Sequence, residues 1–287
     1  VEVTEGEMKK SFYLLFFLFC CNITPLAEIK FQIETVNADS GVLLVPQQYS
    51  TIQSAIEHSS RYYDTILVSP GTYYENINFK GKRIVVKGNG AAEAIIIDGS
   101  QPTDPNKASV VTFNSGEIGF SILDGFAITG GTGSWSWPGK VGGGIFIENA
   151  QAIIKNCIIK NNTAVKGGGV SCGYDYDHQS LNSCVIINCV IANNTSQYDG
   201  SGIYVNFYAS INLDHCTIAN NNFSLSNTTA AALSSISNTI IWSGTTNIGY
   251  GPYEFNYCDI QGGWPSGVGN IDSDPMFCNA QLGNYQL

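Results

Sequence analysis

The sequence predicts an all-β fold, a single-stranded right-handed parallel β-helix with an N-terminal capping helix. Three observations lead to this prediction. A short strand motif recurs along the chain, turns rich in Gly and Asn separate the copies, and an amphipathic helix precedes the first of them. Strands this short cannot bury a hydrophobic face alone, so each must stack on the equivalent strand of the next repeat.

The strand motif is clearest in residues 155–164 (KNCIIKNNTA) and 187–196 (INCVIANNTS). Weaker copies lie at 123–128, 214–222, 237–242 and 256–260. Successive copies are 32, 32, 27, 23 and 19 residues apart. A constant strand motif with variable spacing predicts coils whose strands are kept and whose turns accept insertions.

The repeat also places polar residues at equivalent turn positions. Asn at a turn can form an amide ladder along the solenoid axis. We expect such a ladder just before the repeated Cys, at Asp124, Asn156, Asn188, His215, Asn238 and Tyr257. His215 is then a structural member of the ladder rather than a catalytic or metal-binding residue.

Seven cysteines follow the first 27 residues. Cys157, Cys189, Cys216 and Cys258 share one position of the repeat and are expected to stack as buried thiols. Cys172 and Cys184 flank a loop and could close it as a disulfide.

The start of the solenoid is predicted in residues 49–57, where Ser and Thr precede Ile52, Ala55 and Ile56 on one helical face. Strands are expected in 64–73 and 83–87, after this helix. A helix here would cover the first open coil.

The N-terminus resembles an export signal. Lys9 and Lys10 follow Met8, the expected true start, and an apolar run occupies residues 11–21. We expect residues 1–27 to be upstream sequence and signal peptide, 28–44 a linker, and 45–287 the β-helix, which is expected to continue past the last residue. The predicted location is therefore secreted or on the outer cell surface.

The charge balance excludes some partners. Only 13% of the 287 residues are charged and the net charge is −10. Removing residues 1–27 takes away two basic and three acidic residues, which leaves 11 − 20 = −9. The chain has two arginines, Arg61 and Arg83, and no basic cluster, so we expect no nucleic-acid binding. We expect a monomer.

Several segments carry a family resemblance. Residues 51–56 (TIQSAI) with 68–76 (VSPGTYYEN) resemble the N-terminal cap and first coil of pectin-lyase-fold proteins. Residues 97–100, 110–113, 123–129 and 269–277 are similar to bacterial exported β-helix-repeat proteins, and the GGGI and NNTA pieces resemble repeats of polymorphic outer membrane proteins. The resemblance implies the fold, but this fold serves lyases, hydrolases, adhesins and inert stalks.

Two function classes stay open on these residues. The first is a non-catalytic secreted or cell-surface protein that contacts carbohydrate or another surface. The alternative is a carbohydrate-active enzyme, either a polysaccharide lyase or a glycoside hydrolase. Cleaving polyuronates requires cations and a base at C5, yet no Arg follows Arg83 and the chain is acidic. We therefore expect no polyuronate lyase activity.

The candidate carbohydrate-contacting residues are aromatic. Trp135 and Trp137 occupy a loop rich in Gly and Pro, and flat aromatic faces exposed to solvent stack on sugar rings. The repeat register predicts that Tyr198 lies within two coils of this loop, with Lys140 and Lys166 bordering the same edge. The alternative is that both tryptophans fold back over a coil edge.

One acidic loop could bind a cation. Asp175, Asp177 and His178 alternate in an extended segment, a pattern able to hold Ca²⁺, although a solvated loop is the favoured interpretation. Asp272 and Asp274 are interpreted as turn residues. Nothing else in the sequence requires a cofactor.

Overall fold

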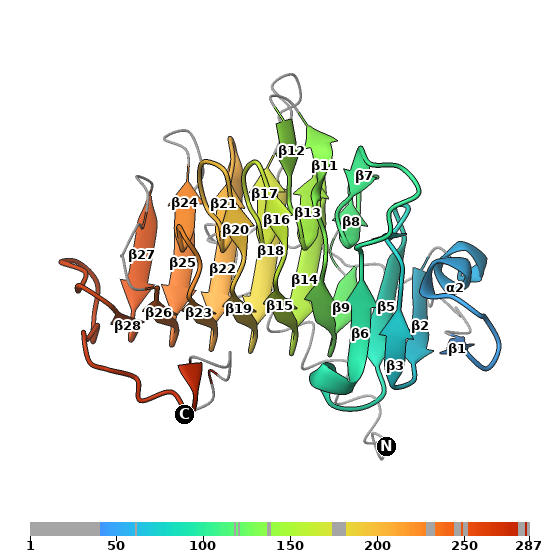
Figure 1. The fold of residues 1–287 in the computed structure, drawn as a ribbon, viewed down its shortest axis with the longest axis horizontal. Coiled ribbons are helices and arrows are strands. Elements are labelled where there is room, and N and C mark those ends of the chain that lie inside the picture. The colour runs from blue at the N-terminus through green and yellow to red at the C-terminus, as the bar shows by residue number, and fades with distance from the viewer. Residues whose placement is uncertain are drawn as a thin grey trace, which may run out of the picture. The chain divides into compact units, whose positions relative to one another are not determined.

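The computed structural model describes residues 41–60, 62–117, 119, 121–136, 139–173, 182–227, 233–243, 248, 252–280 and 285. From Val42 onward these residues form a right-handed parallel β-helix, as predicted. Figure 1 shows its coils stacked side by side, from the blue N-terminal coil to the red C-terminal one. The predicted leader, residues 1–27, lies outside the described residues.

Three parallel sheets run the length of the solenoid. Sheet A contains, in spatial order, β1 (Val42–Val45), β2 (Tyr62–Val68), β5 (Arg83–Gly88), β9 (Ile122–Asp124), β14 (Gln151–Lys155), β18 (Asn182–Ile187), β22 (Ala209–Asp214), β25 (Ser234–Ser237) and β27 (Tyr253–Asn256). Its first strand, β1, begins at Val42, inside the 28–44 segment that was expected to be a linker.

Sheets B and C complete each coil. Sheet B contains β3 (Gly71–Tyr73), β6 (Ile95–Asp98), β10 (Ala127–Thr129), β15 (Ile158–Lys160), β19 (Val190–Ala192), β23 (Thr217–Ala219), β26 (Ile240–Trp242) and β28 (Asp259–Ile260). Sheet C contains β4 (Ile77–Asn78), β8 (Val111–Phe113), β13 (Ile145–Glu148), β17 (Val170–Gly173), β21 (Ile203–Val205) and β24 (Leu225–Asn227).

Shorter elements lie in the turns that join sheets B and C. The strands β7 (Lys107–Ala108), β11 (Gly133–Ser136) and β12 (Gly139–Val141) form a small antiparallel sheet. β16 (Thr163–Ala164) pairs in parallel with β20 (Thr195–Ser196). A 3₁₀ turn, η1 (Ala92–Ala94), precedes β6.

The core is a column of apolar side chains that alternate inward along each strand, for example Ile154, Ile186 and Leu213 on successive strands of sheet A. Phe79 and Phe113 stack with ring centroids 4.1 Å apart. Burial of such a continuous apolar column is the main stabilising contribution that stacked short strands can make.

The predicted thiol column is confirmed. Cys157, Cys189, Cys216 and Cys258 are all buried, and they precede strands that pair in register in sheet B. Thr239 takes this position in the coil between Cys216 and Cys258, and its Oγ1 accepts the Cys216 N–H at 3.3 Å.

Cys172 and Cys184 do not form the disulfide that their positions in the sequence allow. Cys172 and Cys184 are both free and buried, pointing into the apolar core from β17 in sheet C and β18 in sheet A. Burial raises the pKa of the Cys172 thiol to about 12, and it also raises that of Cys184. Both residues are therefore core-filling thiols, because strand alternation rather than the loop between them directs their side chains.

The predicted amide ladder is offset by one residue in its first coil. Asp124 pairs with Lys155, so Gly125 rather than Asp124 occupies the turn position of Asn156. Gly125, Asn156 and Asn188 have φ values of 84°, 54° and 52°, in the left-handed region that Gly and Asn tolerate. Asp124 still joins the ladder from the side, because its Oδ1 accepts the Asn156 Nδ2–H at 2.7 Å.

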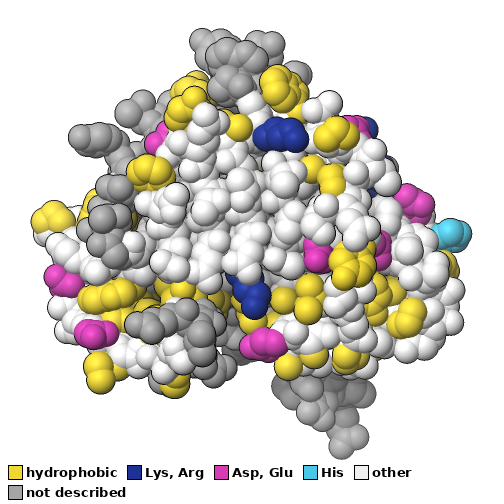
Figure 2. Space-filling model, viewed as in Figure 1, with side chains coloured by type: hydrophobic (Ala, Val, Ile, Leu, Met, Phe, Trp, Pro, Cys, Tyr) yellow, Lys and Arg dark blue, Asp and Glu magenta, His cyan; other side chains and the backbone are white. Residues whose placement is uncertain are grey.

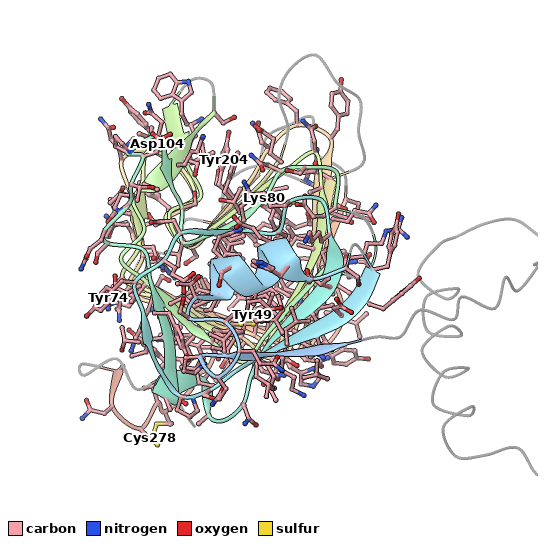
Figure 3. All side chains as sticks on the ribbon, turned by 90° about the vertical axis from the view of Figure 1, so that its right-hand side faces the viewer. Tyr49, Tyr74, Lys80, Asp104, Tyr204 and Cys278 are labelled. Carbon is pink, nitrogen blue, oxygen red and sulfur yellow. The ribbon has the colours of Figure 1, made fainter. Side chains whose placement is uncertain are left out.

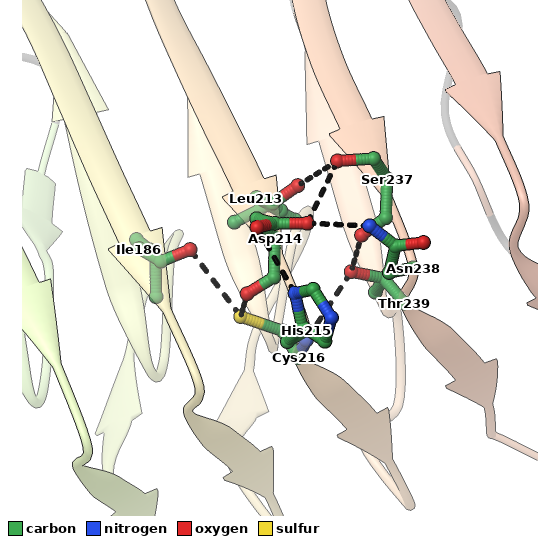
Figure 4. Close-up of polar contacts among 8 residues, drawn as sticks. All are labelled: Ile186, Leu213, Asp214, His215, Cys216, Ser237, Asn238 and Thr239. Carbon is green, nitrogen blue, oxygen red and sulfur yellow. Dashed lines mark hydrogen bonds and ion pairs between the residues drawn. The ribbon is translucent and has the colours of Figure 1, made fainter. Parts of the chain in front are cut away.

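The ladder changes partners at His215. Asn188 donates to Asn156. In the next coils, His215 lies 3.0 Å from the carboxylate of Asp214, and Asn238 donates to the same carboxylate (Figure 4). Burial alone would raise the pKa of Asp214, but the hydrogen bonds from Asn238, His215 and Ser237 outweigh it and hold that pKa below its ordinary value. His215 is thus a structural turn residue with φ of 53°.

The N-terminal coil is covered by α2 (Ile52–His58), as predicted. Thr51 caps this helix, since its Oγ1 accepts the Ser54 N–H at 3.0 Å, and the Ile52, Ala55 and Ile56 side chains are buried. Figure 3 shows α2 lying across the open end of the solenoid.

Candidate functional site

The candidate site is the edge that contains Trp135, Lys140, Lys166 and Tyr198, which we call the aromatic edge. Trp135 on β11 pairs with Lys140 on β12. The Lys140 carbonyl accepts the Val165 N–H at 2.9 Å, and the Val165 carbonyl accepts the Tyr198 N–H at 3.1 Å. The structure therefore brings these segments together at one turn of successive coils, as the register predicted.

The edge is longer than the sequence predicted. The hairpin of β11 and β12 inserts one additional strand, so three inter-strand steps rather than two separate Trp135 from Tyr198. At about 4.8 Å a step, this is about 14 Å rather than about 10 Å.

The two described aromatic side chains of the edge lie in solvent. Trp135 is 60% exposed and Tyr198 is 55% exposed. Neither side chain fills the core, so the alternative in which Trp135 packs back over a coil does not hold. Trp137 lies outside the described residues.

Lys166 does not present a free cation. Its Nζ lies 4.9 Å from the centroid of the Tyr204 ring, 3.3 Å from the Tyr204 hydroxyl and 3.8 Å from the Asp199 carboxylate. The cation–π contact and the ion pair both hold the lysine side chain over β21. Lys140 is half-buried on β12, where its backbone rather than its ammonium group joins the neighbouring coil.

Beneath the aromatic edge lies the outer face of sheet C. Phe146, Ser171 and Tyr204 occupy one in-register row on this face, and each is buried although it points away from the core. The β11 hairpin reaches this face, because Ser136 donates to the Glu148 carboxylate at 2.7 Å. Figure 3 shows Tyr204 rising from the sheet on the same side as Lys80.

Tyr204 and Glu148 were not among the predicted site residues. The one available signal was the alternation in strands such as Ile203–Val205, which directs Tyr204 outward. Tyr204 contacts Lys166 from the preceding coil, and Glu148 contacts the β11–β12 hairpin of its own coil; no local pattern reveals either contact.

The acidic candidates are only partly placed. Asp175, Asp177 and His178 lie outside the described residues. Asp274 is a turn residue as interpreted, since its Oδ1 accepts the Met276 N–H at 2.9 Å. Across the part of the chain that the structure describes, no three His, Cys, Asp or Glu side chains converge in a way that could hold a metal ion.

Within the same described ranges, no helix combines the length and the hydrophobicity that crossing a bilayer requires.

Fold and site together define a right-handed parallel β-helix protein with an exposed aromatic edge. No known family model and no curated protein matches the sequence. Solved structures are nevertheless similar. Escherichia coli YbhC is 12% identical, with 85% of this chain and 76% of that chain covered, at a TM-score of 0.54. A pectin methylesterase from Aspergillus niger is 15% identical, with 82% and 81% covered, at a TM-score of 0.52. At these identities the similarity establishes the pectin-lyase-like fold.

Proposed function

We propose that this chain is a secreted or cell-surface β-helix protein that binds carbohydrate along its aromatic edge. The observation that carries the proposal is the pair of solvent-exposed aromatic side chains, Trp135 and Tyr198, on joined segments of one edge. Exposed aromatic faces lose little by remaining in water but gain stacking and apolar contact when a sugar ring covers them. Trp137, two residues from Trp135, belongs to the same proposal on sequence grounds.

The apparent leader supports the export part of this proposal. Lys9, Lys10 and the apolar run of residues 11–21 have the order of a signal peptide. The resemblance of the repeats to exported bacterial proteins agrees with it.

A second candidate function is a carbohydrate-active enzyme. It is favoured by the fold shared with the Aspergillus niger pectin methylesterase over 82% of this chain. The chemistry nearest to the aromatic edge is the Lys166, Tyr204 and Asp199 cluster. Glycoside hydrolysis uses a pair of carboxyl groups, and Lys166 contacts one described carboxylate. Release of methanol or reducing sugar from a pectin and hemicellulose panel tests this candidate.

The binding proposal is tested with Trp135→Ala and Tyr198→Ala on a panel of immobilised polysaccharides. Each variant should weaken retention of the glycan that the wild type binds by about two- to tenfold, because each removes one stacking surface. The melting temperature should remain nearly unchanged, since both side chains are mainly in solvent.

Tyr257→Ala is the matched control, because Tyr257 is 63% exposed but lies in the turn between β27 of sheet A and β28 of sheet B, whereas the aromatic edge lies between sheets B and C. Equal loss of retention in Tyr257→Ala would contradict a site at this edge. Retention that neither edge variant reduces would also contradict it.

A further inference from the structure

Next to the aromatic edge, the turn between sheets B and C carries a row of exposed hydroxyl groups. Thr163 on β16 pairs with Thr195 on β20. The Thr163 N–H donates to the Gly131 carbonyl, so Thr132 occupies the equivalent position one coil earlier. All three threonines are exposed. Their hydroxyls are linked where the coils meet, since Thr163 Oγ1 and Thr195 Oγ1 lie 2.9 Å apart.

A second polar row runs beside the threonines. Asn161, Asn193 and Asn220 share the left-handed turn conformation, with φ of 57°, 56° and 50°. The Asn220 amide donates to Asn193 Oδ1, and the Tyr285 hydroxyl donates to the same oxygen at 3.0 Å. The threonine and asparagine rows together define what we call the polar face.

The polar face is held rigid from below. The next residue in each coil, Asn162, Asn194 or Asn221, is buried, and its amide hydrogen-bonds to backbone and to the neighbouring Asn. The Asn162 amide, for example, also donates to the Ile128 carbonyl at 3.0 Å. Ligand binding therefore requires little ordering of the polar face, because the coils beneath it are already cross-linked.

The polar face is uncharged. Figure 2 shows that the centre of this view consists mainly of backbone and of side chains that are neither charged nor hydrophobic, with hydrophobic side chains gathered below. Lys160 precedes Asn161 at its border, and the nearby Lys166 is paired with Asp199 and stacked on Tyr204. A net charge of −10 repels polyanions. Hydroxyl and amide groups instead match the hydroxyls of an uncharged sugar.

We propose that the polar face binds an uncharged linear polysaccharide whose chain lies parallel to the solenoid axis, with the aromatic edge stacking on its rings. Equivalent groups recur every coil, at about 4.8 Å, a spacing close to the length of one sugar in an extended chain. The polar face thus offers one hydroxyl or amide group per sugar along the axis. This inference rests on the proposed function and adds the substrate class and the direction of the chain.

The test compares the wild type with Thr163→Val/Thr195→Val on soluble arabinoxylan, glucomannan and polygalacturonate, by isothermal titration at low and high salt. Val keeps the shape and the β-branch of Thr but removes the hydroxyl. We expect the wild type to bind a neutral polysaccharide with little salt dependence, and the double variant to bind it roughly tenfold more weakly. Thr72→Val, at an exposed position of β3, is the matched control and should bind as the wild type does.

The outcomes separate the two proposals. Preference for polygalacturonate with a strong salt dependence would overturn the inference of an uncharged ligand. Loss of binding in Trp135→Ala with unchanged binding in the double variant would overturn the role of the polar face while leaving the aromatic edge intact. Unchanged binding in both variants would overturn both proposals. A thermal melt of the double variant matching the wild type shows that any loss is not unfolding.

Discussion

At the scale of single residues, the two members of each Asn-Asn pair of the repeat occupy different environments. The first Asn of each pair occupies the left-handed turn, where Asn161 and Asn220 are exposed and Asn193 is half-buried. The second Asn is buried as a rung of an internal ladder. Asn is suited to both roles, because it tolerates positive φ and its amide is donor and acceptor at once. The turn role follows from the repeat itself, whereas the burial of Asn162, Asn194 and Asn221 requires the neighbouring coils.

Asn194→Ala should therefore lower the free energy of unfolding by about 2–4 kcal/mol. The Asn194 amide donates to the Ile159 carbonyl and to Asn221 Oδ1, and its own Oδ1 accepts from Asn162. Truncation removes the acceptor of the buried Asn162 N–H and the side-chain donor to the Ile159 carbonyl. Urea unfolding followed by circular dichroism measures the loss, and Asn222→Ala, at an exposed position, should change stability by less than about 0.5 kcal/mol. Equal losses in the two variants would contradict the internal ladder.

The cysteines lead to a second prediction at this scale. Among the described thiols only Cys278 is exposed, and burial raises the pKa of Cys216 to about 11 and that of Cys172 to about 12. In a chain starting at residue 28, Ellman's reagent near pH 8 should modify one thiol in the native state. All seven should react in denaturant. If only five thiols react in denaturant, two cysteines are joined in a disulfide and the prediction is wrong.

At the scale of elements, α2 depends on two side chains of the coil beneath it. The Glu75 carboxylate accepts the N–H groups of Ile52 and Gln53 at 2.9 Å and 2.8 Å, at the helix N-terminus. Lys82 donates to carbonyls at the other end, including that of Ser59 at 2.8 Å. The carboxylate and the ammonium group each oppose the partial charge of the helix end that they contact. A helix of seven residues has little stability of its own.

Glu75→Ala should loosen this helix without unfolding the solenoid. Losing two charge-assisted hydrogen bonds should cost about 2 kcal/mol locally, equivalent to roughly thirtyfold faster amide exchange in residues 52–58. Hydrogen–deuterium exchange with mass spectrometry measures it. Glu93→Ala, an exposed carboxylate on η1, serves as the control. Unchanged exchange in α2 would contradict its dependence on Glu75.

At the scale of the whole molecule, charge limits the chemistry. The chain carries a net charge of −10, and no Arg follows Arg83. Lys166, on the aromatic edge, is engaged by Asp199 and Tyr204. A polyuronate would therefore meet a repulsive field and few cations able to stabilise a carbanion at C5.

We accordingly predict no polyuronate lyase activity. Incubation with polygalacturonate, with and without calcium, should form no unsaturated product absorbing at about 235 nm. A steady rise in absorbance that scales with protein concentration would contradict the prediction. Loss of that rise in Lys166→Ala would then place the base on the aromatic edge.

The residues alone predict the parallel β-helix, the thiol column at Cys157, Cys189 and Cys216, the α2 cap and the register that joins the segments of Trp135 and Tyr198. These features follow from periodicity, which is local and repeats in every coil. Only the tertiary structure decided the placement of Gly125, the free state of Cys172 and Cys184, and the contacts of Lys166 with Tyr204 and of Ser136 with Glu148. The first of these contacts joins two coils and the second joins a hairpin to the sheet of its own coil, and the geometry of the turns involved is set by packing rather than by the repeat.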